Sequence, residues 1–479
     1  MLGELRMNIT SSLKAKLHKS LIKFPHVMQI IQEINAAGGR ALLVGGAVRD
    51  LLLGLSPKDI DIEVHGLKID QFQKILEKFG RVSLVGKSFG VLRLNGLDVD
   101  WSVPRKDSKG RKPKVVIDSN MSLEEAFRRR DLTVNAMGID LITHELIDPF
   151  GGMSDLKAKQ LRVTDKKLFV EDPLRFFRVM QFIGRFEMEP DAELNKICKK
   201  MDLSKISRER IEEEFNKLFL RSRSPSLGIE WLRKVGRLKE ILPEVNALVG
   251  IEQDKKWHPE GDVYIHTLQV LDAMAALAHQ KKFNKHDTLM LMWAALCHDL
   301  GKPETSEEWE DGGVSSYEHE AVGVPLAKKL MKRFSRDKDL IDGVAKVVKY
   351  HMQPGQFIKN KAKPAAYKRL ALKLAPHVTL ETLALFACAD KLGRNPSGMS
   401  YSLQSSIGKK LCNDEFVFRD NAKKLKVLNE VEVPVLHGRD LMGSVAPGPK
   451  MGRLLKKAYE IQIEEGIKNK AKLKKRILS

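Results

Sequence analysis

The chain has 479 residues, of which 43% are hydrophobic, and carries 83 Lys and Arg against 62 Asp and Glu, a formal net charge of +21. This length predicts about three domains that need no disulfide bonds to build a core, and the composition indicates a soluble globular protein. The excess of positive charge favours a polyanionic partner, although it would also serve solubility alone.

Several classes of protein are excluded by the same composition. No run of about 18 apolar residues is present, so neither a membrane-spanning helix nor a membrane partner is expected. The first residues, MLGELRMNITSSLKAKLHKS, lack the apolar core of a secretory signal and predict a short amphipathic helix. The four cysteines form no CxxC, so neither a disulfide framework nor a cysteine zinc site is predicted. We therefore expect a protein of a reducing compartment, the cytoplasm.

Residues 40–165 predict a small α/β domain. Short β-like runs, namely ALLV, DIDIEV, GVLRL and LDVDW, alternate there with helical stretches and glycine turns. After Asp172 almost every segment has the apolar spacing of a helix, interrupted only by turns rich in Gly and Pro. The final segment, GIKNKAKLKKRILS, is basic and would either contact phosphates or extend into solvent.

A glycine turn is the first motif with chemical meaning. ALLVGGAVRDLLLG predicts a strand, a turn at Gly45 and Gly46, and a helix closed by Gly54. Backbone N–H groups and the positive end of the helix would then face the space above the turn, a geometry suited to a phosphate. Because Gly-Gly before a helix is common, the motif is weak on its own.

Carboxylates on two predicted strands form the second motif. In KDIDIEV the two-residue period of a strand places Asp59, Asp61 and Glu63 on one face. The strand LDVDW likewise places Asp98 and Asp100 on one face. A solvated strand face would have the same pattern. However, two carboxylates from one strand and a third from its neighbour can hold two Mg²⁺ ions about 3.5–4 Å apart, as in-line attack of a hydroxyl on phosphorus requires. This pattern indicates nucleotidyl transfer.

The segment EDPLRFFR, residues 171–178, allows two interpretations. Asp172 can cap a helix whose first position is Pro173, where the missing N–H costs nothing. At about 100° per residue, Asp172 and Arg175 are also neighbours on the helix surface, with Arg178 one step further round. A carboxylate beside a guanidinium offers two acceptors next to a fork of donors, which suits the reading of a ligand edge.

Five motifs occur in order: LLVGGAVRDLLLG, KDIDIEV, RRRDLTVNAM, DPFGG and EDPLRFFR. Together, over residues 40–250, they resemble the class II tRNA nucleotidyltransferases, which are the CCA-adding enzymes and the related bacterial poly(A) polymerases. The resemblance implies that Asp172 and Arg175 pair with the incoming base. Cytosine and adenine each present an amino donor beside a ring-nitrogen acceptor, which suits this pair. Guanine and uracil would leave buried groups unpaired, at about 1–3 kcal/mol each.

The resemblance also implies roles for single residues. Catalysis and Mg²⁺ binding would fall to Asp59, Asp61 and Asp100. Asp100 is preferred to Asp98 because of its distance from Arg105. The implied contacts to the triphosphate, the ribose and the base of CTP or ATP are Gly45, Gly46, Arg49, Arg130, Asn135, Asp172, Arg175 and Arg178.

One position departs from the family pattern. A further arginine usually follows Arg178 after three residues, but this chain has Gln181. The difference would weaken phosphate binding or alter how a second nucleotide is read. Arg185, one turn further on, is available as a substitute.

The helical half holds widely spaced histidines and aspartates. A lone histidine on a helix is usually packed or on the surface, but here a histidine, then HD followed by LGK, then two histidines and an aspartate resemble the HD phosphohydrolase superfamily. Such a set binds one or two divalent metals, and imidazole with carboxylate suits Mn²⁺, Fe²⁺, Ni²⁺ or Co²⁺ better than Mg²⁺. His258, His279 and His286 fit no place in it. The implied metal ligands are His266, His298, Asp299, His319, His351 and Asp390.

We therefore predict a multidomain α+β protein. A small α/β nucleotidyltransferase head, with a mixed sheet like that of polymerase beta, would be followed by an all-α neck, an HD body and a tail. The expected segments are an N-terminal helical extension (1–34), the head (35–165), a helical neck that reads nucleotides and binds RNA (166–250), the HD metal phosphohydrolase domain (251–400) and a helical basic tail (401–479).

The expected function is template-independent addition of C and A to the 3′ end of tRNA, whose acceptor arm would be bound by a monomer or homodimer. The HD domain would hydrolyse 3′-phosphate or 2′,3′-cyclic phosphate ends. A poly(A) polymerase or a partial enzyme adding only CC or only A stays open. Two other classes are an HD-type nucleotide phosphohydrolase, disfavoured by the domain order, and a non-catalytic RNA-binding protein, which would need none of these carboxylates and histidines.

Overall fold

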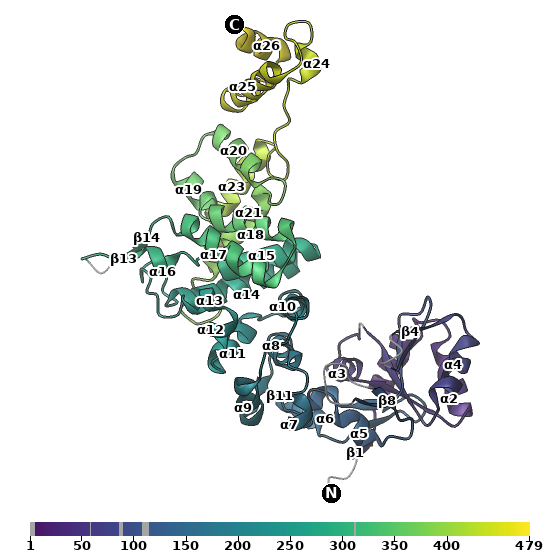
Figure 1. The fold of residues 1–479 in the computed structure, drawn as a ribbon. Coiled ribbons are helices and arrows are strands. Elements are labelled where there is room, and N and C mark those ends of the chain that lie inside the picture. Colours follow the sequence, from purple (N-terminus) through teal and green to yellow (C-terminus); the bar gives the residue numbers. More distant parts are fainter. Residues whose placement is uncertain (1–4, 58, 86–89, 108–114, 311–312) are drawn as a thin grey trace. The chain divides into compact units, whose positions relative to one another are not determined.

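The computed structural model describes residues 5–57, 59–85, 90–107, 115–310 and 313–479. The chain divides into two compact units, Met1–Ile206 and Ser207–Ser479 (Figure 1). The first unit combines a mixed sheet with helices and the second is almost entirely helical, so the predicted α+β class is confirmed. None of the helices within the described ranges is long and apolar enough to cross a membrane.

The first unit is built on an eight-stranded sheet. Its strands lie in the order β1-β10-β9-β2-β3-β6-β5-β4. β3 and β6 are parallel, whereas the other neighbours in this sheet are antiparallel. The strand bounds are β1 (Leu5–Asn8), β2 (Arg40–Val44), β3 (Asp61–His65), β4 (Val82–Val85), β5 (Val91–Leu94), β6 (Asp100–Ser102), β9 (Gly138–Asp140) and β10 (Glu145–Asp148).

Apolar side chains cover both faces of this sheet. On one face, Trp101 of β6 packs against Phe72, with 5.9 Å between the ring centroids. On the other, Leu42 and Val44 of β2 pack with Phe127. Strand β2 thus contributes alternate residues to two cores, as its two-residue period requires. The helices nearest the sheet are α1 (Ser11–Leu21), α2 (Val27–Ala36), α3 (Gly46–Leu52), α4 (Ile69–Glu77) and α5 (Leu123–Arg128).

The N-terminal segment belongs to this unit. Strand β1 pairs with β10 at the edge of the sheet. Leu17 and Leu21 of α1 are buried in the same core as Val48 of α3. Besides helix α1, the segment therefore supplies both a strand and core side chains to this unit.

The remainder of the first unit follows the sheet. Helix α8 is amphipathic and buries Phe176, Phe177 and Met180, which is why a 13-residue helix forms after Pro173. The elements are β7 (Arg105–Asp107), β8 (Val115–Ile117), the 3₁₀ helix η1 (Thr133–Asn135), α6 (Gly152–Ala158), β11 (Gln160–Leu161), α7 (Lys166–Phe169), α8 (Leu174–Phe186), β12 (Glu189–Pro190) and α9 (Ala192–Lys200).

The second unit is centred on α15 (Lys285–Cys297). Its run LMLMWAALC is apolar on every side, and all nine of these residues are buried. Trp293 packs against Phe215 and Phe219 of α10, at 5.5 and 5.0 Å between ring centroids. The neighbouring elements are α10 (Arg208–Arg221), α11 (Ser226–Lys234), α12 (Leu238–Ile241), α13 (Pro243–Asn246), α14 (Val263–Lys281), α16 (Lys302–Thr305), β13 (Ser306–Glu308), β14 (Val314–Ser316), α17 (His319–Phe334), α18 (Lys338–Tyr350), α19 (Gln353–Lys359), α20 (Pro364–Leu374), α21 (Leu380–Leu392), α22 (Ser406–Leu411) and α23 (Asn413–Lys424).

A disulfide bond joins Cys388 of α21 to Cys412, which follows α22. The sequence predicted no disulfide framework, and the spacing of the cysteines did not indicate this single pair. They are 24 residues apart in the sequence, but packing of α21 and α22 brings their Cα atoms to 5.1 Å. The other two cysteines, Cys198 and Cys297, are buried.

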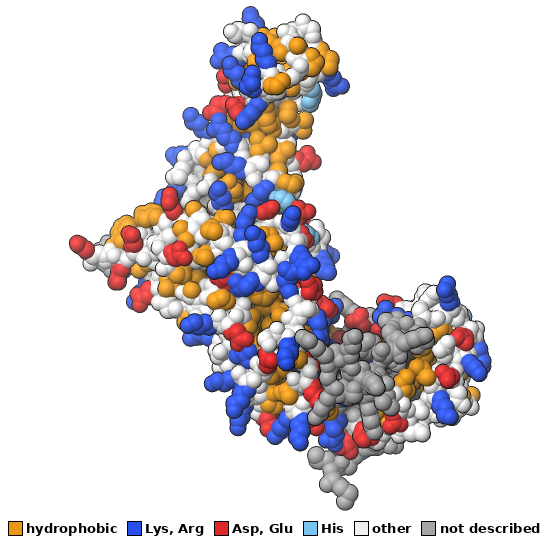
Figure 2. Space-filling model, viewed as in Figure 1, with side chains coloured by type: hydrophobic (Ala, Val, Ile, Leu, Met, Phe, Trp, Pro, Cys, Tyr) orange, Lys and Arg blue, Asp and Glu red, His pale blue; other side chains and the backbone are white. Residues whose placement is uncertain are grey.

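The C-terminal segment forms a helical group with a core of its own. Leu473 and Ile477 of α26 (Lys470–Leu478) pack with Leu441 and Met451. The basic segment thus folds as a helix that buries its apolar side and does not extend into solvent. Figure 2 shows Lys and Arg side chains over the visible face of this group. The remaining bounds are α24 (Gly438–Leu441) and α25 (Pro449–Glu465).

Candidate active site and candidate metal centre

The parallel pairing of β3 and β6 brings two of the predicted catalytic carboxylates together. Asp61 and Asp100 are the first residues of their strands and lie directly opposite one another in the register. Asp59 lies two residues before β3, is exposed, and is close enough for its charge to act on Asp61. All three predicted carboxylates therefore lie at the same end of neighbouring strands.

The pKa of Asp61 reflects the closeness of these carboxylates. Burial raises the pKa of Asp61, Arg130 opposes the rise, and the charges of Asp100 and Asp59 add to it. Carboxylates at close range disfavour the ionisation of one another, and a divalent cation between them removes that repulsion. A set made only of carboxylate oxygens fits Mg²⁺, which accepts oxygen ligands.

Two neighbours of these carboxylates have contacts that the sequence analysis did not predict, and one of them, Arg93, was not singled out there at all. Arg93 of β5 forms an ion pair with Asp100 through two hydrogen bonds, one of them 3.0 Å between Nη2 and Oδ2. Glu63 shares the strand face of Asp61, as predicted, but is 2% exposed and lies 3.0 Å from Nε2 of His65. The carboxylate of Glu63 is therefore buried and contacts His65.

The glycine turn lies beside the carboxylates. Gly45 has φ of +71°, and a Cβ on it would lie 2.7 Å from Nη1 of Arg130 and 4.0 Å from Oδ2 of Asp61. A Cβ on Gly46 would lie 3.2 Å from Nη2 of Arg49. Gly45 is required both for its left-handed backbone and for the close approach of the Arg130 guanidinium.

A buried polar network links α3, η1 and α8. Arg49, 4% exposed, donates to Oδ1 of Asn135 at 2.6 Å. Asn135 in turn donates to Asp131 at 2.9 Å, and Arg178 donates to the same carboxylate at 2.6 Å. Burial raises the pKa of Asp131, but Arg178 and Asn135 outweigh it and hold that pKa far below its ordinary value. The structure thus unites three predicted nucleotide-binding residues around an aspartate that the sequence analysis did not single out.

The start of α8 resolves part of the ambiguity in EDPLRFFR. Helix α8 begins at Leu174, one residue later than expected, and Oδ1 of Asp172 accepts a hydrogen bond from the N–H of Leu174 at 3.3 Å. Arg175 donates to the carbonyls of Leu168 and Arg129, at 2.9 and 2.6 Å. These bonds fix the guanidinium of Arg175 close to Asp172, whose charge acts on it.

Gln181, the departure from the family pattern, is 1% exposed. Its Oε1 accepts a hydrogen bond from Nη1 of Arg185 at 3.2 Å, and the Arg185 guanidinium lies over the ring of Phe186 at 4.6 Å. Gln181 therefore serves as a buried acceptor that holds Arg185. Whether Arg185 substitutes for the missing arginine stays a prediction.

Six residues predicted as metal ligands converge in the second unit, from α14, the end of α15, α17, the end of α18 and α21. Their ligand atoms form two groups, and within each group these atoms lie within 4.8 Å of one another. All six side chains are buried, with at most 6% of each residue exposed. The groups are His266, His298 and Asp390, and Asp299, His319 and His351.

Distances between ligand atoms are short. Nε2 of His266 lies 3.1 Å from Asp390, and Nε2 of His298 lies 3.2 Å from Asp299. Nevertheless, the Nε2 atoms of both histidines are buried without a hydrogen-bond partner among the residues that the structure describes. These Nε2 atoms and carboxylate oxygens face one another without hydrogen bonds, an arrangement that a cation bound between them would explain. The ligand types fit a transition metal.

The other ring nitrogen of three ligand histidines faces the backbone. Nδ1 of His298, His319 and His351 each lies 2.8–2.9 Å from the carbonyl oxygen three residues earlier. A carbonyl can only accept, so the proton belongs on Nδ1 and Nε2 is free to bind a metal. The pKa of His351 falls to about 3, because of its burial and the nearby His319 and His298, which keeps the ring neutral.

The buried carboxylates stay ionised. Burial raises the pKa of Asp299, but His298 and Lys302 outweigh it and hold that pKa well below its ordinary value. The same holds for Asp390, where Arg394 is the largest opposing charge. Ionised carboxylates and neutral imidazoles are the forms that ligate metals.

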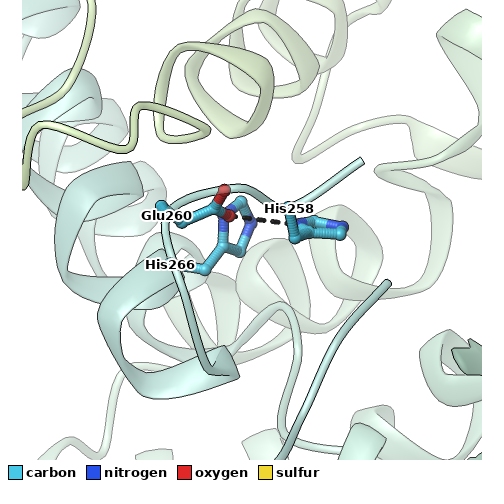
Figure 3. A group of neighbouring side chains, drawn as sticks. All are labelled: His258, Glu260 and His266. Carbon is cyan, nitrogen blue, oxygen red and sulfur yellow. Dashed lines mark hydrogen bonds and ion pairs between the residues drawn. The ribbon is translucent and has the colours of Figure 1, made fainter. Parts of the chain in front are cut away.

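Two residues beside this centre were missed. His258, which fitted no place in the sequence pattern, lies next to His266, with 4.8 Å between ring centroids. Oε1 of Glu260 lies 2.9 Å from Nδ1 of His258 and 2.7 Å from Nδ1 of His266 (Figure 3). Burial lowers the pKa of His258 to about 4, whereas the two imidazoles outweigh the burial of Glu260 and lower its pKa to about 2. An HxE motif shortly before a ligand histidine was the available signal. His279 and His286 take no part in these groups.

Three family models match the chain. The Poly A polymerase head domain matches residues 41–162, the probable RNA and SrmB-binding site of polymerase A matches residues 185–248, and the HD domain matches residues 263–392. The Multifunctional CCA protein of Neisseria meningitidis serogroup A is 36% identical over 318 residues, which are 65% of this chain and 72% of that relative. The chain belongs to the CCA-adding enzyme family.

Other CCA proteins and CCA-adding enzymes match as well. The Multifunctional CCA protein of Pseudomonas aeruginosa is 33% identical over 355 residues, 72% of this chain and 78% of that relative. A CCA-adding enzyme in an apo form matches 99% of this chain and 97% of its own, with 19% identity and a TM-score of 0.62. The Thermotoga maritima CCA-adding enzyme complexed with tRNA matches 96% and 97%, with 19% identity and a TM-score of 0.58. These structures share the fold, and the predicted family is confirmed.

The network around Asp131 generates a prediction on stability. Asp131→Ala should lower the free energy of unfolding of the first unit by about 3–5 kcal/mol, because the buried partners Arg178 and Asn135 lose their acceptor. Hydrogen exchange of the β2 and β3 amides measures this unit without the second. Asp70→Ala, on the exposed first turn of α4, is the control and should cost no more than about 1 kcal/mol. Equal protection in both variants would show that the network contributes little.

Proposed function

We propose that this member of the CCA-adding enzyme family adds C and A, from CTP and ATP, to the 3′ end of tRNA without a nucleic-acid template. The observation that carries the proposal is the register of Asp61 opposite Asp100, beside the Gly45 turn and Arg130. Its curated relatives are named Multifunctional CCA protein, and solved neighbours are CCA-adding enzymes with CTP, with ATP and with tRNA. The net charge of +21 suits an RNA partner. We place this activity in the cytoplasm.

Different residues of the head would bind the metal and the triphosphate. Asp59, Asp61 and Asp100 would hold Mg²⁺, which activates the 3′-hydroxyl and stabilises the charge that develops on phosphorus. Arg130 lies against the Gly45 backbone and close to Asp61, where its guanidinium can neutralise a triphosphate. Arg49 would contribute a second positive charge.

Asn135, which lies between Arg49 and Asp131, would contact the ribose. The same network holds Arg178 of α8. A nucleotide that displaces one of these hydrogen bonds would therefore also change the contacts of Arg178. The buried network would thus link binding of the sugar and phosphates to the helix that reads the base.

Base selection would fall to Asp172 and Arg175. The carbonyls of Leu168 and Arg129 accept two N–H groups of Arg175 and so fix the plane of its guanidinium. A guanidinium has five N–H donors, so others remain to face a ring nitrogen while Asp172 accepts from the exocyclic amino group. A rigid pair of this kind reads cytosine and adenine alike and excludes guanine and uracil.

The second unit would carry a metal-dependent phosphohydrolase that acts on 3′-phosphate or 2′,3′-cyclic phosphate ends of RNA. Its six buried ligands suit Ni²⁺, Co²⁺, Mn²⁺ or Fe²⁺, which lower the pKa of bound water and so supply a nucleophile near neutral pH. Lys302 and Arg394, held at Asp299 and Asp390, place positive charge beside the ligands. Hydrolysis of a 3′-phosphate, or of the P–O3′ bond of a cyclic phosphate to leave a 2′-phosphate, would free the 3′-hydroxyl that the head needs.

One alternative has an observation in its favour. The model that matches residues 41–162 is described as a Poly A polymerase head domain, so the head alone does not separate poly(A) synthesis from CCA addition. Incubation with tRNA lacking its 3′ end and with each NTP separately, followed by sequencing of the products, tests the proposal. We expect CTP to add two residues and ATP to add one only after them.

The carboxylates are tested by Asp61→Ala and Asp59→Ala. Each should lower nucleotide addition by several powers of ten while tRNA affinity and the fold are retained, because Mg²⁺ loses a ligand. Asp98→Ala is the matched control on the same segment as Asp100 and should retain activity. Incorporation near the wild-type rate by either variant would refute the two-metal assignment.

Selectivity is tested by Asp172→Ala and Arg175→Ala. Discrimination of C and A against U and G should fall more than triphosphate binding does, because one partner of the pairing edge is lost. The readout is the ratio of kcat/KM for CTP and ATP to that for UTP and GTP. Glu171→Ala, an exposed neighbour, is the control. If Asp172→Ala only lowers stability, by about 0.5–2 kcal/mol, its role is confined to the helix start.

Hydrolysis is tested by His298→Ala and Asp299→Ala. Both should abolish hydrolysis of a 2′,3′-cyclic nucleotide and leave CCA addition intact, and Ni²⁺, Co²⁺ or Mn²⁺ should restore activity to chelated wild type. His279→Ala, which changes an exposed histidine outside the ligand groups, is the control. A wild-type protein that binds no transition metal and leaves the substrate untouched would mean that this unit is a platform for tRNA.

A further inference from the structure

One ligand histidine is held differently from the others. Nδ1 of His298, His319 and His351 faces a backbone carbonyl of its own helix or turn. Nδ1 of His266 instead lies 2.7 Å from Oε1 of Glu260. A full negative charge therefore replaces the partial charge of a carbonyl at one ligand only.

Glu260 reaches this position from the segment before α14, residues 251–262. Its side chain is completely buried, and the same Oε1 accepts from Nδ1 of His258 at 2.9 Å. Figure 3 shows the carboxylate beside the His266 ring, with a dashed line running to His258. A buried carboxylate in contact with two imidazoles has a fixed direction, because moving it would leave a charge without partners.

The segment that carries Glu260 is itself anchored at both ends. Gln253 accepts a hydrogen bond from Nζ of Lys302 at 2.7 Å and donates to the carbonyl of Gly261 at 3.2 Å. Asp262 caps α14 through the N–H of Ile265 at 2.8 Å. The position of Glu260 is thus determined by the fold of the segment.

We propose that Glu260 is a positioning residue of the metal centre: it keeps the proton of His266 on Nδ1 and directs the Nε2 lone pair at the metal, while His258 holds Glu260 in place. This inference rests on the proposed metal-binding function of the second unit. A carboxylate partner makes the imidazole a stronger donor than a carbonyl partner does. The effect is confined to the group that contains His266, His298 and Asp390.

A different use of the same three residues is a separate metal site, since their ligand atoms also lie within 4.8 Å of one another. That use would require His266 to release its Nδ1 proton while Nε2 faces Asp390. The 2.9 Å contact between Glu260 and His258 is a hydrogen bond and the 2.7 Å contact between Glu260 and Nδ1 of His266 is an ion-pair distance, so the positioning role accounts for the geometry without that step. Metal stoichiometry separates the two uses.

The experiment is titration of metal-free full-length protein with Co²⁺, in excess Mg²⁺ to occupy the carboxylates of the head, followed by the Co²⁺ absorption bands. We expect wild type to bind Co²⁺ in two steps. Glu260→Gln should weaken one step by about 10–100-fold and shift the band of that ion at saturation. Glu252→Gln, an exposed glutamate of the same segment, is the matched control and should match wild type.

Each result decides a different point. Absence of Co²⁺ binding by wild type refutes the proposed metal function and the inference with it. Wild-type binding together with unchanged affinity and bands in Glu260→Gln overturns the inference alone. Loss of a third equivalent of Co²⁺ with the other two steps unchanged assigns a separate site instead. If Glu260→Gln does not fold, Glu260→Asp withdraws the charge by one methylene and should weaken one step several-fold; an unchanged step overturns the inference.

Discussion

Both candidate sites depend on one constraint: charged side chains that are buried away from water must be paired with partners inside the protein. In the first unit, the carboxylate of Asp131 holds Arg178 and Asn135, and through Asn135 it holds Arg49. In the second unit, buried carboxylates and imidazoles face one another, and Lys302 forms an ion pair with Asp299. Isolated buried charges are too costly to keep, so each group persists only in the geometry that satisfies its neighbours. That geometry is what makes the sites rigid before any ligand arrives.

Much of this arrangement was readable from the sequence because it follows from short-range rules. The period of a strand placed Asp59 and Asp61 on one face. The six residues that the structure brings together in the second unit were, by contrast, implied by the resemblance to the HD superfamily. The change from α/β to helix near Asp172 was visible in the spacing of apolar residues. Local periodicity fixes which way a side chain points, so residues within one element are predictable.

The missed features depend on contacts between different elements or on segments outside any helix or strand. Nothing in the local pattern showed that Glu63 would be covered or that Arg93 would pair with Asp100, since both follow from the order of strands in the sheet. The pairing of Cys388 with Cys412 follows from helix packing. Glu260 lies outside any helix or strand, where periodicity gives no information, although its HxE spacing before His266 was a usable clue.

The strand β1 has a consequence for handling the protein. Leu5–Asn8 occupies the outer edge of the sheet next to β10, whose Asp148 also accepts the N–H groups that open α6. A long edge strand offers its backbone to other chains, whereas β1, with four residues, offers little backbone for intermolecular pairing. Removal of the first eight residues would leave Asp59, Asp61 and Asp100 unchanged. It would, however, make β10 the edge strand, with its backbone open to pairing with another chain, and so favour self-association. Purification schemes should therefore keep this strand and add affinity tags at the other end.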